Sequence, residues 1–357
     1  MTPTDARIDD VVVRPDDSVA RSLQVMDSSG HRIVLVTDED RTLLGVVTDG
    51  DVRRWILGGN DLAEPVSAAM NAHPVTLPAG STPDQAREIM VAQRIDCVPL
   101  VDDRGRVTSA VWWLDLFETA APARGSIDTP VVVMAGGKGT RLSPYTNILP
   151  KPLMPLGDQT ILELILDRFS AYGADRFFVT LNYKANLIKA YFADADTPYD
   201  ITYVHEDEPL GTGGSLSLMR AQLDTTFILT NCDIVVDADY SDIVRHHNEH
   251  GNAITLVAST RHETIPYGVC EVAEGGSLVA IQEKPQFNFL VSTGFYVVDP
   301  SILDMVPDHT FIHMTDIINE CLEAGRPVGV YPISERSWVD IGEFESLQDT
   351  LAHFGLA

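Results

Sequence analysis

The sequence predicts an α/β protein throughout, built from a repeated N-terminal part and a larger C-terminal part. Two observations support this. Residues up to about 120 contain an internal repeat at a spacing of 64 residues, each copy reading as helix, strand, acidic turn, strand, helix. Further along, the short continuous apolar runs Val131–Met134 and Phe227–Thr230 are typical of buried parallel strands.

Length and composition limit the class of protein. A chain of 357 residues suits two or three domains. Its 25 Lys+Arg against 52 Asp+Glu give a net charge of −27, which argues against a nucleic-acid partner because such proteins need a basic surface. No apolar run approaches the roughly 18 residues of a membrane span, and Met1–Asp5 do not resemble a signal peptide. We therefore expect a cytoplasmic protein without a membrane partner.

A segment of small and helix-breaking residues separates the predicted domains of the chain. The small, breaker-rich segment Ala120–Ser126 indicates a boundary between the repeated part and the rest. We expect one domain over residues 1–60, a second over 61–122 and a third over 129–357. The four cysteines are too far apart to predict a disulfide or a zinc site; they are Cys97, Cys232, Cys270 and Cys321.

The repeat is defined by matching segments. A shift of 64 residues places Ile33–Asp38 on Cys97–Asp102. Upstream of each, Ser18 and Thr82 are suited to cap helices over about residues 18–28 and 82–93. One unit of this size has too little core to fold alone, so we expect the two copies to pack face to face.

The first copy contains Gly45-Val46-Val47-Thr48-Asp49-Gly50-Asp51, and the second copy keeps Asp115 but has Trp112 in place of the hydroxyl residue. The pair resembles tandem cystathionine-β-synthase-type (CBS) domains, which bind adenine nucleotides between their copies. The resemblance implies a regulatory adenine nucleotide at Thr48, Asp51 and Asp115. Two alternatives remain: Asp51 caps a helix over residues 52–57, or the pair serves only dimerisation. We also expect a homo-oligomer.

A glycine-rich segment, Ala135–Leu142, follows the first central strand. Its glycines allow backbone N–H groups to approach phosphates, and Lys138 adds a cation. It is not a Walker A loop, because Gly139 stands where Ser or Thr is required. It is not a dinucleotide fingerprint either, because Leu142 replaces the third glycine.

The following residues make the glycine-rich segment specific. Residues 136–156, GGKGTRLSPYTNILPKPLMPL, resemble the opening motif of the sugar-1-phosphate nucleotidylyltransferases, and the resemblance extends over residues 129–350. It implies a Rossmann-like mixed-sheet nucleotidyltransferase domain after the CBS-domain pair. It also implies transfer of a nucleoside monophosphate from a nucleoside triphosphate to a hexose 1-phosphate, with release of pyrophosphate.

The attacking phosphate oxygen in such a reaction is already anionic, so catalysis consists mostly of positioning and charge neutralisation. The resemblance implies catalytic roles for Arg141, through its planar fork, and for Lys151, whose neighbours Pro150 and Pro152 stiffen the backbone. Nucleotide contacts are expected from Gly136, Gly137, Lys138, Gly139 and Thr140.

The segment His205–Leu216 resembles the family's base-recognition segment. Gly211, Thr212 and Gly213 are expected to lie against the base, and the Glu206 carboxylate to accept from guanine. The acidic lead-in is most similar to that of mannose-1-phosphate guanylyltransferases, which favours GTP. The alternative is a solvated acidic loop.

Two aspartates are candidate ligands of Mg²⁺. Asp233 follows the apolar run Phe227–Thr230, at the carboxyl end of a predicted parallel strand. Asp340 stands in Trp338-Val339-Asp340-Ile341-Gly342, which matches a late motif of the family. We expect the ion to bridge the two reacting phosphates. Cys232, next to Asp233, is expected to be a small buried filler.

The family's sugar-phosphate site is expected at Glu283 and Lys284, with Gly268, Thr293 and Gly294 lining the sugar pocket. Mannose and glucosamine 1-phosphates are the leading acceptors. Two alternatives remain for the whole protein. One is a uridylyl- or thymidylyltransferase of the same fold, and the other is a catalytically silent adaptor that senses adenine nucleotides.

Overall fold

The computed structural model describes residues 8–93, 95–112, 125–195 and 197–341. They divide into two compact units. One combines the residues up to 112 with residues 259–291 and 332–336, and the other contains residues 125–258, 292–331 and 337–341. None of the helices in these ranges is long and apolar enough to cross a membrane. The predicted division at 1–60, 61–122 and 129–357 stays a prediction.

The sequence repeat is a structural repeat. Helix α2 (Val19–Ser29) and strands β2 (Ile33–Thr37) and β3 (Leu43–Thr48) recur 64 residues later. Their counterparts are α4 (Pro83–Gln93), β5 (Cys97–Val101) and β6 (Val107–Trp112). Each antiparallel pair has an irregularity at the same place, after Val36 and after Leu100. Ser18 caps α2 by accepting from Arg21 N, as predicted.

The two copies pack against one another, which confirms the expectation from their small size. One core cluster takes Val11, Leu35 and Val46 from the first copy and Val107 and Trp112 from the second. Backbone hydrogen bonds join the copies as well, from Leu43 N to Gly105 O at 2.9 Å and from Val107 N to Arg41 O at 2.9 Å. Each copy therefore completes a core that neither could close alone.

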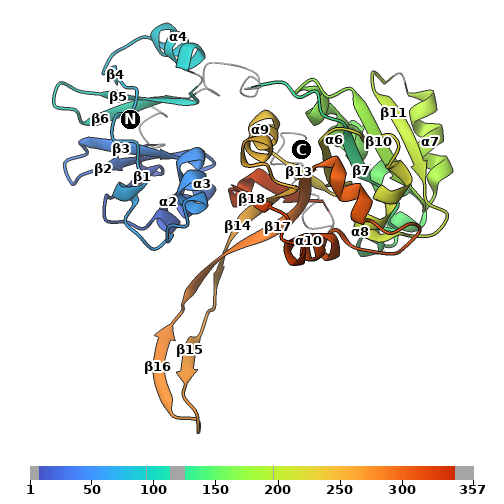
Figure 1. Cartoon of the computed structure of the whole chain (residues 1–357). Helices are drawn as coiled ribbons and strands as arrows, with labels where there is room; N and C mark the ends of the chain where they lie inside the picture. The colour runs from blue at the N-terminus through green and yellow to red at the C-terminus, as the bar shows by residue number, and fades with distance from the viewer. Residues whose placement is uncertain (1–7, 94, 113–124, 196, 342–357) are drawn as a thin grey trace. The chain divides into compact units, whose positions relative to one another are not determined.

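The second unit is built on a mixed seven-stranded sheet with the order β11-β10-β7-β12-β17-β14-β18 (Figure 1). Strands β11, β10, β7 and β12 run parallel to one another, and β17 runs antiparallel to β12. The predicted apolar runs are the central strands β7 (Val131–Met134) and β12 (Phe227–Asn231). Their carboxyl ends lie at one edge of the sheet, where parallel α/β sheets bind ligands.

Packing fixes the remaining elements of this unit. A core cluster joins Val132 and Leu229 of the sheet to Leu216 and Ile317. The further elements here are β10 (Arg176–Leu181), β11 (Asp200–His205), β13 (Ile234–Val236), β18 (Val328–Ile333), β19 (Trp338–Asp340), α6 (Ile161–Ser170), α7 (Ala185–Asp194), α8 (Gly211–Gly214), α9 (Tyr240–His250) and α10 (Met314–Glu323). Strands β8 (Pro155–Leu156) and β9 (Gln159–Thr160) form a short antiparallel pair.

The repeats also contain the two-residue strands β1 (Val12–Val13) and β4 (Leu77–Pro78) and the helix α3 (Asp49–Leu57).

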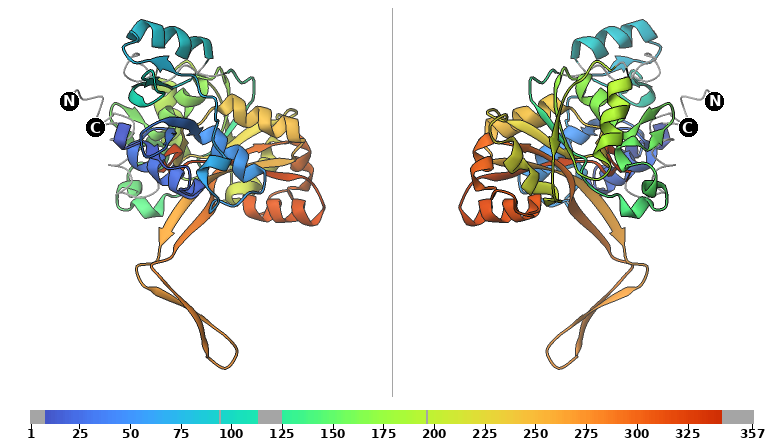
Figure 2. Two further views of the ribbon diagram at one scale, coloured as in Figure 1. Left: turned by 90° about the vertical axis from the view of Figure 1, so that its left-hand side faces the viewer. Right: turned by 90° about the vertical axis from the view of Figure 1, so that its right-hand side faces the viewer.

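Strands β14 (Ile254–Thr264) and β17 (Gln286–Val298) continue into a hairpin of β15 (Gly268–Val272) and β16 (Leu278–Glu283). Figures 1 and 2 show this hairpin as a long two-stranded ribbon. All six residues of β16 are exposed. Two strands alone bury little apolar surface, so such a ribbon is weakly stabilised.

His247 makes the stability of the second unit depend on pH. The side chain is 2% exposed on α9, and Nδ1 lies 3.0 Å from Thr255 Oγ1. Burial lowers the pKa of His247 below its ordinary value of 6.5. Below that value the unfolded chain binds a proton that the folded chain resists, so stability falls as the pH falls.

We expect the wild type to lose more unfolding free energy between pH 7.5 and pH 5.5 than a His247→Asn variant does. Urea unfolding at both pH values measures the difference. His250→Asn, at an exposed position on the same helix, is the control and should keep the wild-type slope. Equal slopes for wild type and His247→Asn would show that His247 does not set this dependence.

Candidate active site

The glycine-rich loop leaves β7 and turns sharply at Gly139. This residue has φ +62°, in the left-handed region, and a Cβ there would lie 3.0 Å from Thr146 and 3.1 Å from Lys151. A side chain would therefore push apart the two segments that the loop brings together. Thr146 Oγ1 donates to Gly139 O at 3.0 Å and closes the turn. Residues 136–153 thus fold back on themselves through short 3-10 turns.

Four of the predicted catalytic and metal residues converge at this edge of the sheet. Lys151 is 5% exposed, and its Nζ lies 2.8 Å from Asp233 Oδ2. Arg141 lies 3.3 Å from the same carboxylate and 3.7 Å from Asp340 Oδ2. Asp340 reaches this position because β19 pairs antiparallel with β13, which places it opposite Ile234.

The side chains of this cluster differ in their exposure to solvent, and the difference indicates what each of them can do. The Lys151 side chain is 7% exposed and that of Asp233 20%, whereas the Arg141 side chain is 55% exposed. Lys151 is thus a fixed internal charge, while Arg141 faces solvent and can turn to an incoming anion. Cys232, beside Asp233, is buried, and burial raises the pKa of its thiol to about 12. The neutral thiol is a poor nucleophile, in agreement with its predicted role as a filler.

The chemistry of Asp233 and Asp340 fits a divalent cation. Both carboxylates contact the single guanidinium of Arg141, so they face a common space. Hard cations such as Mg²⁺ are bound through one or two carboxylates, with the other ligands coming from water and phosphate oxygens. Within the described ranges, no three His, Cys, Asp or Glu residues gather closely enough to hold a metal by themselves. A cation here would depend on substrate phosphates for further ligands.

Glu206 lies against the glycine-rich loop. It is 4% exposed, its Oε2 accepts from Leu210 N at 3.1 Å, and a Cβ on Gly136 would meet its Oε1 at 2.8 Å. Burial raises the pKa of Glu206, with the hydrogen bonds from Leu210 and Thr180 opposing this effect. The structure thus places Glu206 beside the glycine-rich loop. Whether the carboxylate accepts from a base stays a prediction.

The glycines of α8 are needed for close approach to another part of the chain. A Cβ on Gly211 would lie 2.5 Å from Ile312 O, and one on Gly214 would lie 2.2 Å from Thr310 O. Thr212 Oγ1 accepts from Met314 N at 3.1 Å. Residues 211–214 are therefore supported by residues 310–314, which the sequence did not point to. Contact of Gly211, Thr212 and Gly213 with a nucleotide stays a prediction.

Two of the predicted sugar-pocket residues lie on β17, next to β12. Gly294 has φ +81°, and a Cβ there would meet Asn231 Nδ2 at 2.4 Å, at the end of β12. Thr293 is buried, and its hydroxyl donates inward to Val257 O at 2.8 Å. Gly294 thus lies near Asp233, while the Thr293 hydroxyl is already engaged within the sheet.

The other sugar-phosphate residues lie on the hairpin. Gly268 pairs with Glu283, and Lys284, which is exposed, donates its backbone N–H to Tyr267 O at 3.2 Å. This segment belongs to the other compact unit. Their roles stay predictions.

In the CBS-type repeats, Thr48 and Asp51 form a capping box at the start of α3. Thr48 is the N-cap, and Asp51 Oδ2 accepts from Thr48 N at 2.8 Å and from Thr48 Oγ1 at 2.6 Å. Asp51 therefore supports the helix from its third residue and is not itself the cap. Asp51 also pairs with Arg54. Asp115 lies outside the described residues.

Trp112 contributes to the core between the two repeats. It is 3% exposed and stacks on His31 with ring centroids 3.8 Å apart. The indole therefore fills space at the position where the first repeat has a hydroxyl, and one histidine of the first copy covers its face.

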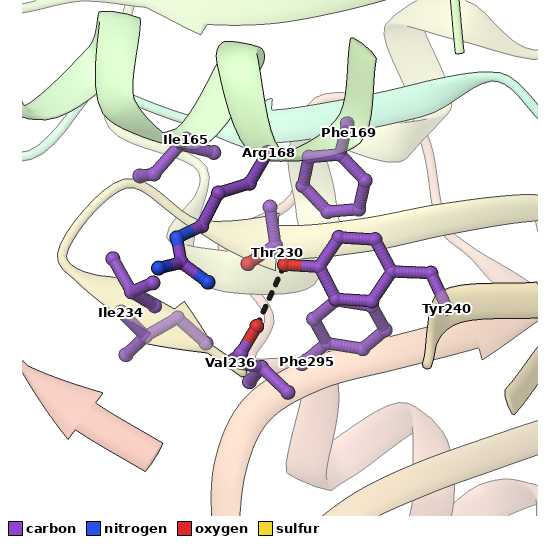
Figure 3. Close-up of a pocket in the computed structure, with 9 residues that line it drawn as sticks. Ile165, Arg168, Phe169, Thr230, Ile234, Val236, Tyr240 and Phe295 are labelled. Carbon is purple, nitrogen blue, oxygen red and sulfur yellow. Dashed lines mark hydrogen bonds between the residues drawn. The ribbon is translucent and has the colours of Figure 1, made fainter. Parts of the chain in front are cut away.

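A small cavity lies behind the Asp233 loop, between α6 and strands β12, β13 and β17 (Figure 3). Its lining is mostly apolar, and the Arg168 side chain points along it toward Asp237, 3.3 Å away. Tyr240 closes one side, with its hydroxyl donating to Val236 O at 2.7 Å, the dashed line in Figure 3. Ile234 and Val235, which follow Asp233 in the chain, are among the residues that line this cavity.

One further cation near the loop was missed by sequence reasoning. Lys184 Nζ donates to Asn147 O and to Ile148 O, both at 2.6 Å, and so contacts the same glycine-rich loop region as Lys151. The sequence signal that could have pointed to Lys184 is the scarcity of lysine: the chain has five lysines, so each one is more informative than usual.

Comparison with known proteins agrees with this geometry. The family model described as nucleotidyl transferase matches residues 130–354, and the CBS domain model matches residues 4–58 and 66–111. A UTP–glucose-1-phosphate uridylyltransferase of Synechocystis is 28% identical over 233 residues, covering 59% of this chain and 60% of that protein. A mannose-1-phosphate guanylyltransferase catalytic subunit beta of Xenopus tropicalis is 30% identical over 222 residues, covering 59% of this chain and 61% of that protein.

The crystal structure of HddC from Yersinia pseudotuberculosis, also solved in complex with GMP-PN, has the same fold over 63% of this chain and 99% of that one. Its TM-score is 0.50 and its sequence identity 21%. The chain spans about 60% of the length of the curated relatives that it matches. Because the family model covers more than half of the 357 residues, the chain belongs to the nucleotidyl transferase family, and its N-terminal part carries the CBS-domain matches.

Proposed function

We propose that the protein is a sugar-1-phosphate nucleotidylyltransferase that joins a nucleoside triphosphate, preferably GTP, to a hexose 1-phosphate. An oxygen of the sugar phosphate attacks the α-phosphorus, the bond from that phosphorus to the α–β bridging oxygen breaks, and pyrophosphate leaves. The observation that carries the proposal is the convergence of Arg141, Lys151, Asp233 and Asp340 beside the glycine-rich loop.

Each side chain has a role that follows from its position. Lys151, buried and paired with Asp233, supplies a positive charge that needs no reorganisation when phosphates arrive. Arg141, which is exposed, exchanges its carboxylate partners at 3.3 and 3.7 Å for the triphosphate. Asp233 and Asp340 would hold Mg²⁺, which when bound neutralises charge on the reacting phosphates.

GTP is favoured because Glu206 offers an acceptor beside the phosphate loop, and guanine presents donors at N1 and its amino group. The acceptor sugar is proposed to be mannose or glucosamine 1-phosphate, in keeping with the named mannose-1-phosphate guanylyltransferase relatives. A specific observation also favours a second candidate: a relative named as a uridylyltransferase for glucose 1-phosphate matches as well. A thymidylyltransferase of the same fold belongs to this second candidate.

The CBS-type pair is proposed to bind an adenine nucleotide near Thr48 and Asp51 and so to adjust activity. The nucleotide's ribose would have to compete with Arg54 for the Asp51 carboxylate. The alternative for this pair is that it only joins copies of the chain.

A matrix of five nucleoside triphosphates against several hexose 1-phosphates tests the main proposal. We expect pyrophosphate release to be fastest with GTP and with mannose or glucosamine 1-phosphate, and chelation of divalent ions to abolish it. Turnover only with UTP or dTTP would overturn the choice of base. Adenine-nucleotide binding without turnover in any combination would favour the silent adaptor.

Replacing Lys151 by Met should lower kcat/KM by about 10²–10³-fold, because a fixed charge close to the reacting phosphates is lost. Asp233 keeps Arg141 as a partner, so the variant should fold. Steady-state kinetics measures the effect. Lys189→Met removes the same charge from α7, where Nζ lies 5.8 Å from the Tyr203 ring centroid, and should leave the kinetics unchanged. A Lys151→Met variant with normal kcat/KM would remove this residue from the mechanism.

Calorimetry tests the regulatory site. The full-length protein should bind AMP, ADP or ATP, and Asp51→Asn should weaken that binding by about tenfold, because a charged acceptor of the ribose hydroxyls is lost. Asp49→Asn, in the same helical turn and paired with Arg53 at 3.4 Å, is the matched control and should bind normally. If none of the three nucleotides gives heat with the wild type, the pair has no such ligand.

A further inference from the structure

Lys184 adopts an unusual backbone conformation at the junction of β10 and α7. Its φ of 53° and ψ of 32° place it in the left-handed region, which residues with a Cβ rarely occupy. Glycine or asparagine is the ordinary choice at such a position. A lysine in this conformation, in a chain with only five lysines, indicates that the side chain serves a purpose there.

The side chain binds the main chain of the loop between Arg141 and Lys151. Its ammonium donates to Asn147 O and Ile148 O, at 2.6 Å each. The preceding residue, Tyr183, donates its hydroxyl to Thr146 O at 3.1 Å. Two consecutive side chains therefore bind three consecutive carbonyl groups, those of residues 146, 147 and 148.

Apolar burial does not hold this part of the loop. Ile148 is 76% exposed, Tyr145 is 51% exposed and Leu149 is 39% exposed. Burial of such side chains is the usual source of loop stability, and here it is largely missing. Polar contacts therefore help to position residues 145–149, and those of Lys184 and Tyr183 join the loop to the segment between β10 and α7.

The loop position matters because both cations of the site are attached to it. Arg141 lies before residues 145–149 and Lys151 follows them after Pro150. Thr146, whose carbonyl Tyr183 binds, also donates to Gly139 O and so ties this bend to the phosphate loop. A shift of the bend would move Lys151 against Asp233 and alter how Arg141 meets a triphosphate.

We propose that Lys184 is a positioning residue for nucleotidyl transfer: its ammonium clamps the Asn147 and Ile148 carbonyls and thereby sets the geometry of Arg141 and Lys151. Lys184 acts through the loop and does not touch the substrate. This inference rests on the proposed function for its kinetic consequence, whereas the clamp itself is a property of the folded chain.

The test uses two variants and one control in the full-length protein. Lys184→Met removes the ammonium and keeps the chain length, while Lys184→Asn removes it and tolerates the left-handed backbone. Lys189→Met is the control and removes the same charge from α7, where the Lys189 Nζ lies 5.8 Å from the Tyr203 ring centroid. All three are compared with the wild type by kinetics, thermal unfolding and amide hydrogen exchange.

We expect both Lys184 variants to lower kcat by about ten- to a hundredfold, with a smaller change in KM, because misplacement of the charges affects the transition state most. The melting temperature of Lys184→Asn should be close to that of the wild type. Amide exchange over residues 145–149 should accelerate in both variants. Lys189→Met should match the wild type in all three measurements.

Unchanged exchange over residues 145–149 in Lys184→Met would overturn the clamp. A lower melting temperature with normal kcat in the folded fraction would show a purely structural role and would also overturn the proposal. If the wild type lacks turnover with every substrate pair, the proposed function fails, and the exchange measurement still decides whether the clamp exists.

Discussion

The ion pair between Lys151 and Asp233 is the contact on which the candidate active site depends. Lys151 is almost entirely buried, so its ammonium must have a partner, and the carboxylate 2.8 Å away provides one. The pair links the glycine-rich loop after β7 to the end of β12. Arg141 extends the contact to Asp340, so two cations and two carboxylates form one network with no net charge. A divalent cation that enters this network with a polyanionic substrate would offset part of the substrate's negative charge.

Close contacts between main-chain segments bring this network together. Gly139, Gly211 and Gly294 each have a positive φ, and a Cβ at any of them would lie within 3.0 Å of another part of the chain. Gly139 lies in the loop after β7, Gly211 begins α8, and Gly294 lies within β17 beside the end of β12. The loops can therefore approach more closely than side chains would allow, which is why the motifs of this site are rich in glycine.

The net charge of −27 is compatible with the binding of phosphate substrates. Charges on the surface are screened over about 8 Å at physiological ionic strength, so the local groups decide binding. Lys151 and Arg141 supply positive charge inside the loop region, and Lys184 contacts the loop from α7. The acidity of the whole chain and the lysine and arginine side chains around the loop are separate features.

Much of the fold was readable from the sequence because local patterns determine it. The shift of 64 residues predicted the repeated helix and strands, and the apolar runs predicted β7 and β12, since periodicity and burial are local signals. Roles that depend on contact were less accessible. The sequence offers Asp51 as a helix cap, yet Thr48 is the cap, because the Thr48 hydroxyl accepts from Asp51 N while the Asp51 carboxylate accepts from Thr48 N. Residues 310–314 support the Gly211 segment without any motif of their own.

The sequence by itself therefore determined the family, the two kinds of domain and the residue types of the site, because composition, motifs and their spacing indicate these features directly. Only the tertiary structure decided which of those residues meet. Lys151 and Asp233 are 82 positions apart in the chain, and Lys184 lies 36 positions from the Ile148 carbonyl that it binds. Such contacts arise from the order of the strands in the sheet and from glycines that allow loops to cross, and no local pattern encodes either.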